Sequence, residues 1–119
     1  MLNQPHARCR LLPLNQLAAL KLKEAGEKAD PLQLPVFQLM DWGLRNGLRT
    51  THRRTITELD HLQTLDPETA FAYLTAKLPG GLPALQRRLL ALPPRPAAEL
   101  LLDTLDMRLK ADPRNPYPA

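Results

Sequence analysis

The sequence predicts an all-α fold: a compact single-domain bundle of five or six short helices joined by Pro/Gly turns. Leucine occurs 27 times among 119 residues, whereas valine and isoleucine occur once each. Leucine loses little side-chain freedom in a helix, while strands favour β-branched and aromatic residues, and aromatic residues make up only 4% of this chain. The 13 prolines and five glycines fall between leucine-rich blocks, where they mark helix ends and turns.

The first two predicted helices follow prolines. After Pro13, one block runs over about residues 14–28, and proline in a first helical turn costs little because that N–H lacks a helical partner in any case. A second block begins at Pro35, and its apolar residues repeat at helical spacing. Asn46–Gly47 predicts a left-handed C-cap for this second helix.

The third and fourth helices begin with capping signals. Thr55 and Glu58 match the capping box, in which each side chain satisfies a backbone N–H of the first turn. Asp66 and Pro67 predict the N-cap and first position of the fourth helix, which Pro79–Gly81 ends.

The last two helices are separated by a run of prolines. A fifth helix is expected over 82–92, with Pro83 in its first turn. We expect residues 93–96 to form a stiff, extended connector and the sixth helix to span about 96–110, before Asp112 and the proline that follows it.

The apolar residues that share the inner faces of these helices are the candidate core. They are Leu14, Leu17, Ala18, Leu20 and Leu22; Val36, Leu39, Met40, Gly43 and Leu44; Ile56, Leu59 and Leu62; Ala70, Phe71, Leu74 and Leu78; Leu82, Leu85, Leu89 and Leu92; and Ala98, Leu101, Leu102, Leu105 and Leu109. We expect residues 13–111 to form one helical domain, between a flexible N-terminal segment (1–12) and a flexible proline-rich tail (112–119).

Charge and cysteine usage restrict the compartment and the partners. The chain has 16 Lys+Arg against 12 Asp+Glu, a formal charge of +4, which suits an acidic partner such as nucleic acid but is also ordinary surface charge. Cys9 is the only cysteine, so no disulfide forms within the chain, which suits a reducing compartment. No apolar stretch approaches the length of a membrane span. We therefore expect a cytoplasmic protein without a membrane partner.

The sequence offers little catalytic chemistry. The HExxH, EF-hand, paired CxxC, GxGxxG and GK[ST] motifs are all absent. His61 and Asp60 are neighbours on a predicted helix and so point about 100° apart. Asp103 and Asp106 are best explained as solvated ion-pairing residues. We therefore expect a non-enzymatic protein with no cofactor and no metal site.

The favoured hypothesis is a small protein–protein interaction module, such as an adaptor, a chaperone or a regulator, that is able to self-associate as a homodimer. Leu100 and Met107 fall almost opposite the core stripe of the last helix, and Trp42 falls away from the core face of the second. A helix that is apolar on two faces is either central in the fold or in contact with a partner. These three residues are therefore the candidate interaction residues.

The alternative is a nucleic-acid-binding regulator. Its candidate residues form a basic cluster: Arg45, Arg49, His52, Arg53 and Arg54. In a helix, Arg45, Arg49 and Arg53 would line one edge, ready for phosphates, although Asn46–Gly47 interrupts that helix. A third hypothesis, a small hydrolase or transferase that uses His61 or His52, requires one of these histidines in a concave pocket beside a carboxylate.

Overall fold

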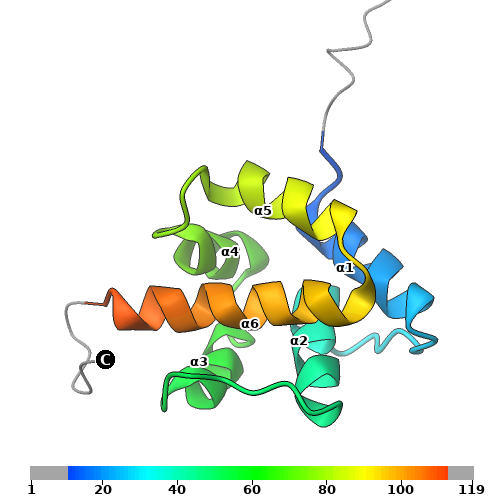
Figure 1. Ribbon diagram of the computed structural model, residues 1–119, viewed down its shortest axis with the longest axis horizontal. Helices are drawn as coiled ribbons and strands as arrows, with labels where there is room; N and C mark the ends of the chain where they lie inside the picture. Colours follow the sequence, from blue (N-terminus) through cyan, green and yellow to red (C-terminus); the bar gives the residue numbers. More distant parts are fainter. Residues whose placement is uncertain (1–10, 113–119) are drawn as a thin grey trace, which may run out of the picture.

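All regular elements of the protein over residues 11–112, the part that the computed structural model describes, are α-helices. They are α1 (Leu14–Glu24), α2 (Pro35–Arg45), α3 (Thr55–Leu62), α4 (Pro67–Thr75), α5 (Gly81–Ala91) and α6 (Pro94–Lys110). The prediction of a compact all-α bundle is confirmed (Figure 1). Within this range no helix combines the length and the apolar character needed to cross a membrane.

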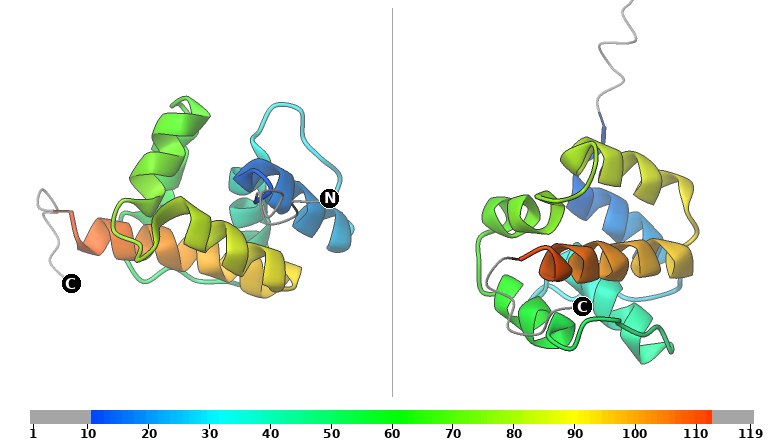
Figure 2. Two further views of the ribbon diagram at one scale, coloured as in Figure 1. Left: turned by 90° about the horizontal axis from the view of Figure 1, so that it is seen from above. Right: turned by 60° about the vertical axis from the view of Figure 1, so that its left-hand side comes forward.

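Helix α6 organises the bundle. Figure 1 shows it along the long axis of the molecule, with α4 and α5 on one side and α2 and α3 on the other. It packs against each of the other five helices, while α1 also packs on α2 and α5 (Figure 2). Because α6 is surrounded, it is buried on most of its circumference, including Leu100 and Thr104.

Local signals set most of the helix ends. Asp66 caps α4 through a hydrogen bond from the Thr69 amide to its carboxylate (2.9 Å), as predicted. Gly47 ends α2 at φ +94°, a left-handed conformation that glycine adopts without strain. Helix α1 ends at Glu24, about one turn earlier than expected.

Two predictions about helix starts were wrong. Thr55 is not an N-cap: Arg54 holds that position, and the buried Thr55 hydroxyl donates to the Asp106 carboxylate instead. Residues 94–96 are not an extended connector but the first turn of α6. Prolines fit there because the first N–H groups of a helix have no helical acceptor.

The core is built mainly from leucines on the predicted faces, with two exceptions. Leu20 and Ile56 were expected inside but are 44% and 54% exposed. Phe37, which was not assigned to the core, is 1% exposed and lies near Phe71, with their ring centroids 6.1 Å apart.

Two further expectations, flexible segments over 1–12 and 112–119, concern the ends of the chain. Cys9 and most of the two segments expected to be flexible lie outside the described residues. At the start of the expected tail, Asp112 is buried, and its amide donates to the Leu109 carbonyl (3.1 Å).

Candidate functional site

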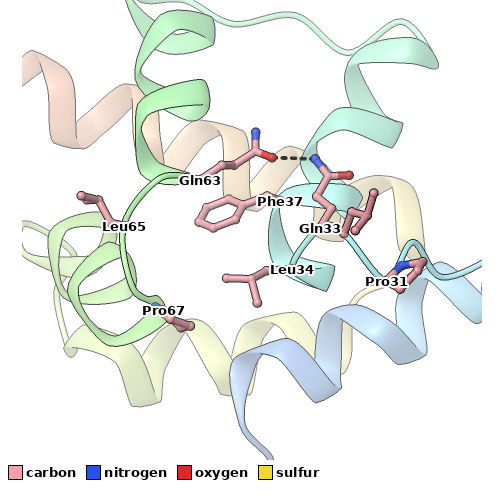
Figure 3. A pocket seen from close by; sticks show the side chains of 8 residues that line it. Pro31, Gln33, Leu34, Phe37, Gln63, Leu65 and Pro67 are labelled. Carbon is pink, nitrogen blue, oxygen red and sulfur yellow. Dashed lines mark hydrogen bonds between the residues drawn. The ribbon is translucent and has the colours of Figure 1, made fainter.

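A surface pocket of about 300 Å³ lies between the α1–α2 loop, the first turn of α2 and the α3–α4 turn. Figure 3 shows Leu34 and Phe37 lining its apolar wall, with Gln33 and Gln63 meeting across one side. The lining residues are Pro31, Leu32, Gln33, Leu34, Phe37, Gln63, Leu65 and Pro67. Sequence reasoning missed this pocket because two segments about 30 positions apart form it.

The loop that forms one edge of the pocket is held by a buried glutamine of α2. The Gln38 side chain accepts from the Asp30 amide (3.0 Å) and donates to the Lys28 carbonyl (2.7 Å). The Asp30 carboxylate in turn accepts from the Leu32 amide (2.9 Å). This pinned loop holds Leu32 at the pocket with 93% of its surface exposed.

The polar wall of the pocket is an amide pair. Gln33 Nε2 donates both to Gln63 Oε1 (2.8 Å) and to Asp41 Oδ2 (2.5 Å). Gln63 Nε2 makes a long hydrogen bond to the Leu59 carbonyl (3.4 Å). The donors of Gln33 are therefore engaged within the protein.

Carboxylates neighbour residues of the pocket lining on three different segments. Asp30 precedes the lining residue Pro31, Asp66 precedes Pro67, and Asp41 bonds to Gln33. Hydrogen bonds from the Thr69 hydroxyl and then from the Thr69 amide hold the pKa of Asp66 below its ordinary value. Asp66 is therefore an anion at neutral pH.

The basic cluster of the sequence lies on a loop, not on a helix. Residues 46–54 connect α2 to α3, so Arg45, Arg49 and Arg53 do not share a helical edge. Arg45 and Arg49 are exposed, and Arg45 Nη2 lies 3.3 Å from the Glu27 carboxylate. Arg53 is also exposed.

The other two members of the basic cluster face the protein. His52 is buried and its Nδ1 accepts from the Arg54 amide (3.1 Å). Arg54 is half-buried and pairs with Glu58 at 3.7 Å. His52 therefore helps to shape the loop and is not available to a ligand on the surface.

Arg95 joins this loop from the first turn of α6. Its Nη1 donates to the Asn46 carbonyl, and its Nη2 lies 3.8 Å from the position a Gly47 Cβ would take. Sequence reasoning missed Arg95 because 49 residues separate it from Asn46. The exposed arginines at this turn are therefore Arg45, Arg49 and Arg95.

The three candidate interaction residues have different environments. Leu100 is 7% exposed and belongs to the core, because other helices surround α6. Trp42 is half-buried and packs against the core, and Met107 is 41% exposed. Only Met107 of the three is an exposed apolar side chain.

A second hollow, of about 360 Å³, lies on the outer face of α1. Leu12 and Leu20, which are 43% and 44% exposed, line it together with Gln16, Ala19 and Lys23. All of its lining residues come from α1 and the residues just before it, so no second element faces them.

His61 meets part of the condition for the enzyme hypothesis. It is exposed and lines a pocket of about 460 Å³ with Arg54, Thr57, Glu58 and Asp112. Glu58, however, pairs with Arg54. The pKa of Tyr73 is raised above its ordinary value, mainly because the phenol is partly buried and secondly because of the negative charge of Glu58. Among residues 11–112, no group of three His, Cys, Asp or Glu side chains is arranged to hold a metal ion.

Comparisons with known proteins add no family to this description. No protein-family model matches the chain, and no curated protein or solved structure shows significant similarity to it.

Proposed function

We propose that this protein is a small, non-enzymatic protein–protein interaction module and that the pocket beside Leu32 is its binding surface. The observation that carries this proposal is Leu32 itself, which is 93% exposed and held at the pocket by a hydrogen-bonded loop. Burial of a leucine side chain is favourable by about 1.5–3 kcal/mol, so a partner that covers it gains affinity. A loop that is already ordered reduces the entropy lost on binding.

A cytoplasmic location is part of the proposal and rests on the single cysteine of the chain. Self-association belongs to the same class of function, because a second copy is also a protein partner.

Selection from a random peptide library displayed on phage tests the proposal. The bait is the immobilised protein, compared with a Gln63→Trp variant that fills the pocket and a Gln16→Trp control on the outer face of α1. We expect enriched peptides that bind the wild type and the control about tenfold more tightly than the filled variant. Thermal unfolding verifies that both variants fold. If no enriched peptide distinguishes the filled variant from the control, the proposal is wrong.

We propose nucleic-acid binding as the second candidate function, because Arg95 adds to the arginines of the α2–α3 loop. Arg45, Arg49 and Arg95 are all exposed around the turn at Gly47, and guanidinium groups bind phosphate oxygens in bidentate geometry. This version differs from the helical edge expected from the sequence, because the arginines come from a loop and from a distant helix.

A further inference from the structure

The charge around the pocket differs in sign from that of the chain as a whole. The chain carries a formal charge of +4, yet the charged residues next to or bonded to the pocket lining are Asp30, Asp41, Asp66 and Glu68. No lysine or arginine lines the pocket. The negative charge beside the pocket therefore favours a cationic ligand there, whereas the net positive charge of the chain disfavours one elsewhere.

The carboxylates beside the pocket lining are acceptors. The Gln33 NH₂ group donates to Asp41 and to Gln63, so its donors are already used within the protein. Asp30 accepts from the amide of the lining residue Leu32, Asp66 directly precedes the lining residue Pro67, and an ionised carboxylate only accepts. A ligand that pairs with these carboxylates brings donors, such as an ammonium or a guanidinium group.

The apolar groups define the other half of the ligand. Leu34 and Phe37 face the pocket in Figure 3, and Leu32 stands exposed beside it. A volume of about 300 Å³ suits one bulky side chain better than an extended apolar surface.

We propose that the pocket binds a segment of another protein in which one bulky apolar side chain is flanked on both sides by lysine or arginine. The apolar side chain contacts Leu32, Leu34 and Phe37, and the flanking cations lie against Asp30 and Asp66. This inference rests on the proposed function and names the class of partner that the same pocket takes.

Fluorescence anisotropy with three labelled nonapeptides tests the inference. The first peptide has a central leucine between Lys-Arg pairs, the second has glycine in place of the leucine, and the third has the leucine between Glu-Asp pairs. We expect the first to bind about tenfold more tightly than the other two at about 50 mM salt, and to lose affinity at about 200 mM. Equal binding of the glycine or the acidic peptide overturns the inference.

Variants locate the binding on the protein. Asp30→Asn/Asp66→Asn removes two charges but keeps the oxygen that accepts from the Leu32 amide and the N-cap oxygen of α4. We expect this variant to bind the first peptide about fivefold more weakly and with less dependence on salt. The matched control Glu99→Gln/Asp103→Asn removes two exposed charges from α6 and is expected to bind as the wild type does. Wild-type binding by the Asp30/Asp66 variant overturns the inference.

The apolar contact has its own pair of variants. We expect Leu32→Ser to weaken binding of the first peptide about fivefold and Leu20→Ser, at the hollow on α1, to leave it unchanged. Equal effects of the two variants contradict the proposed place of the apolar side chain.

Other outcomes separate this inference from the proposed function. Phage selection that returns pocket-dependent peptides without lysine or arginine leaves the proposed function intact and overturns the inference. If no peptide depends on the pocket, both are wrong.

A second copy of the chain is the alternative occupant, because α5 exposes Leu90 near Arg87. Light scattering that shows a dimer lost in the Asp30→Asn/Asp66→Asn variant, without peptide binding to the wild type, assigns the pocket to that copy and overturns the inference.

Discussion

Asp106 joins the loop before α3 to the central helix. Its carboxylate accepts hydrogen bonds from the Thr51 amide (2.8 Å), the Thr51 hydroxyl (2.9 Å) and the Thr55 hydroxyl. Asp106 is 3% exposed and Thr55 is fully buried, so water does not replace these bonds if the carboxylate is lost. One side chain of α6 thereby sets both the course of the arginine-bearing loop and the start of α3.

We predict that Asp106→Ala lowers the free energy of unfolding by about 2–4 kcal/mol, because it leaves a buried hydroxyl and an amide without their acceptor. Urea denaturation followed by circular dichroism measures the change. The control is Asp103→Ala, which lies one turn away on the exposed side of α6 and is expected to change stability by less than about 0.5 kcal/mol. Equal effects of the two substitutions contradict the anchoring role.

Asp66 gives a prediction about pH. Because the hydrogen bonds from Thr69 lower its pKa from 3.8 in the folded state, ionised Asp66 favours folding above that value. This contribution is lost as the pH falls through the folded-state pKa. We expect the wild type to lose stability relative to Asp66→Asn, which keeps a cap oxygen but does not titrate, below about pH 3.8. Urea denaturation between about pH 2.5 and 7 measures the difference, and a difference that is constant over this range contradicts the prediction.

These residues also show which side-chain roles can be read from a sequence. The Asp66 cap was predicted because its partner, Thr69, lies three positions away. The partners of Asp106 and Arg95 lie 55 and 49 positions away, and nothing in the local pattern identifies them. Asp106, expected to be solvated, is instead buried because its side of α6 faces the loop before α3.

At the scale of helices, the boundaries were more predictable than the faces. Proline and glycine act on the backbone locally, so Pro35, Asn46–Gly47 and Pro67 mark ends that the structure has. Leucine, in contrast, occurs on inner and outer faces alike in this chain. Spacing therefore placed Leu20 inside, although it is 44% exposed on α1.

The crossing of α2 and α6 depends on a glycine. A Cβ at Gly43 would lie 2.9 Å from Ala98 Cβ and 2.7 Å from Leu48 Cδ1, closer than such atoms pack. The leucine side chain is able to rotate away, but Ala98 Cβ moves only with the backbone of α6. The absence of a side chain at Gly43 thus lets the two helices approach closely.

We predict that Gly43→Ala lowers the free energy of unfolding by about 1–2 kcal/mol, because overlap with α6 outweighs the better helix propensity of alanine. The double variant Gly43→Ala/Ala98→Gly is expected to be less destabilised than the sum of its two single variants, since it removes the opposing methyl group. Urea denaturation of all four proteins gives the coupling free energy. A Gly43→Ala variant as stable as the wild type contradicts the close approach.

For the whole molecule, α2 separates the pocket from the turn that carries the exposed arginines. Phe37, in the first turn of α2, lines the pocket. Arg45 is the last residue of the same helix and lies about 12 Å further along its axis. The sequence predicted an all-α bundle and a basic segment, but neither the pocket nor the position of Arg95 follows from periodicity. Both depend on how the loops pack, which involves contacts between residues distant in the sequence.

The separation of these surfaces predicts that binding of nucleic acid and of peptide respond to different substitutions. Arg49→Gln/Arg95→Gln removes two cations near the Gly47 turn and keeps amide donors there. If this surface contacts phosphates, the variant binds a labelled random-sequence DNA duplex more weakly. The slope of its binding constant against salt concentration, on logarithmic scales between about 50 and 200 mM, then falls by the amount expected for about two phosphate contacts.

The control Arg87→Gln/Arg88→Gln removes the same charge from exposed positions of α5 and is expected to retain the wild-type salt dependence. Anisotropy measures both, and equal losses in the two variants would attribute the binding to net charge alone. Absence of binding at about 50 mM salt rules out this second function.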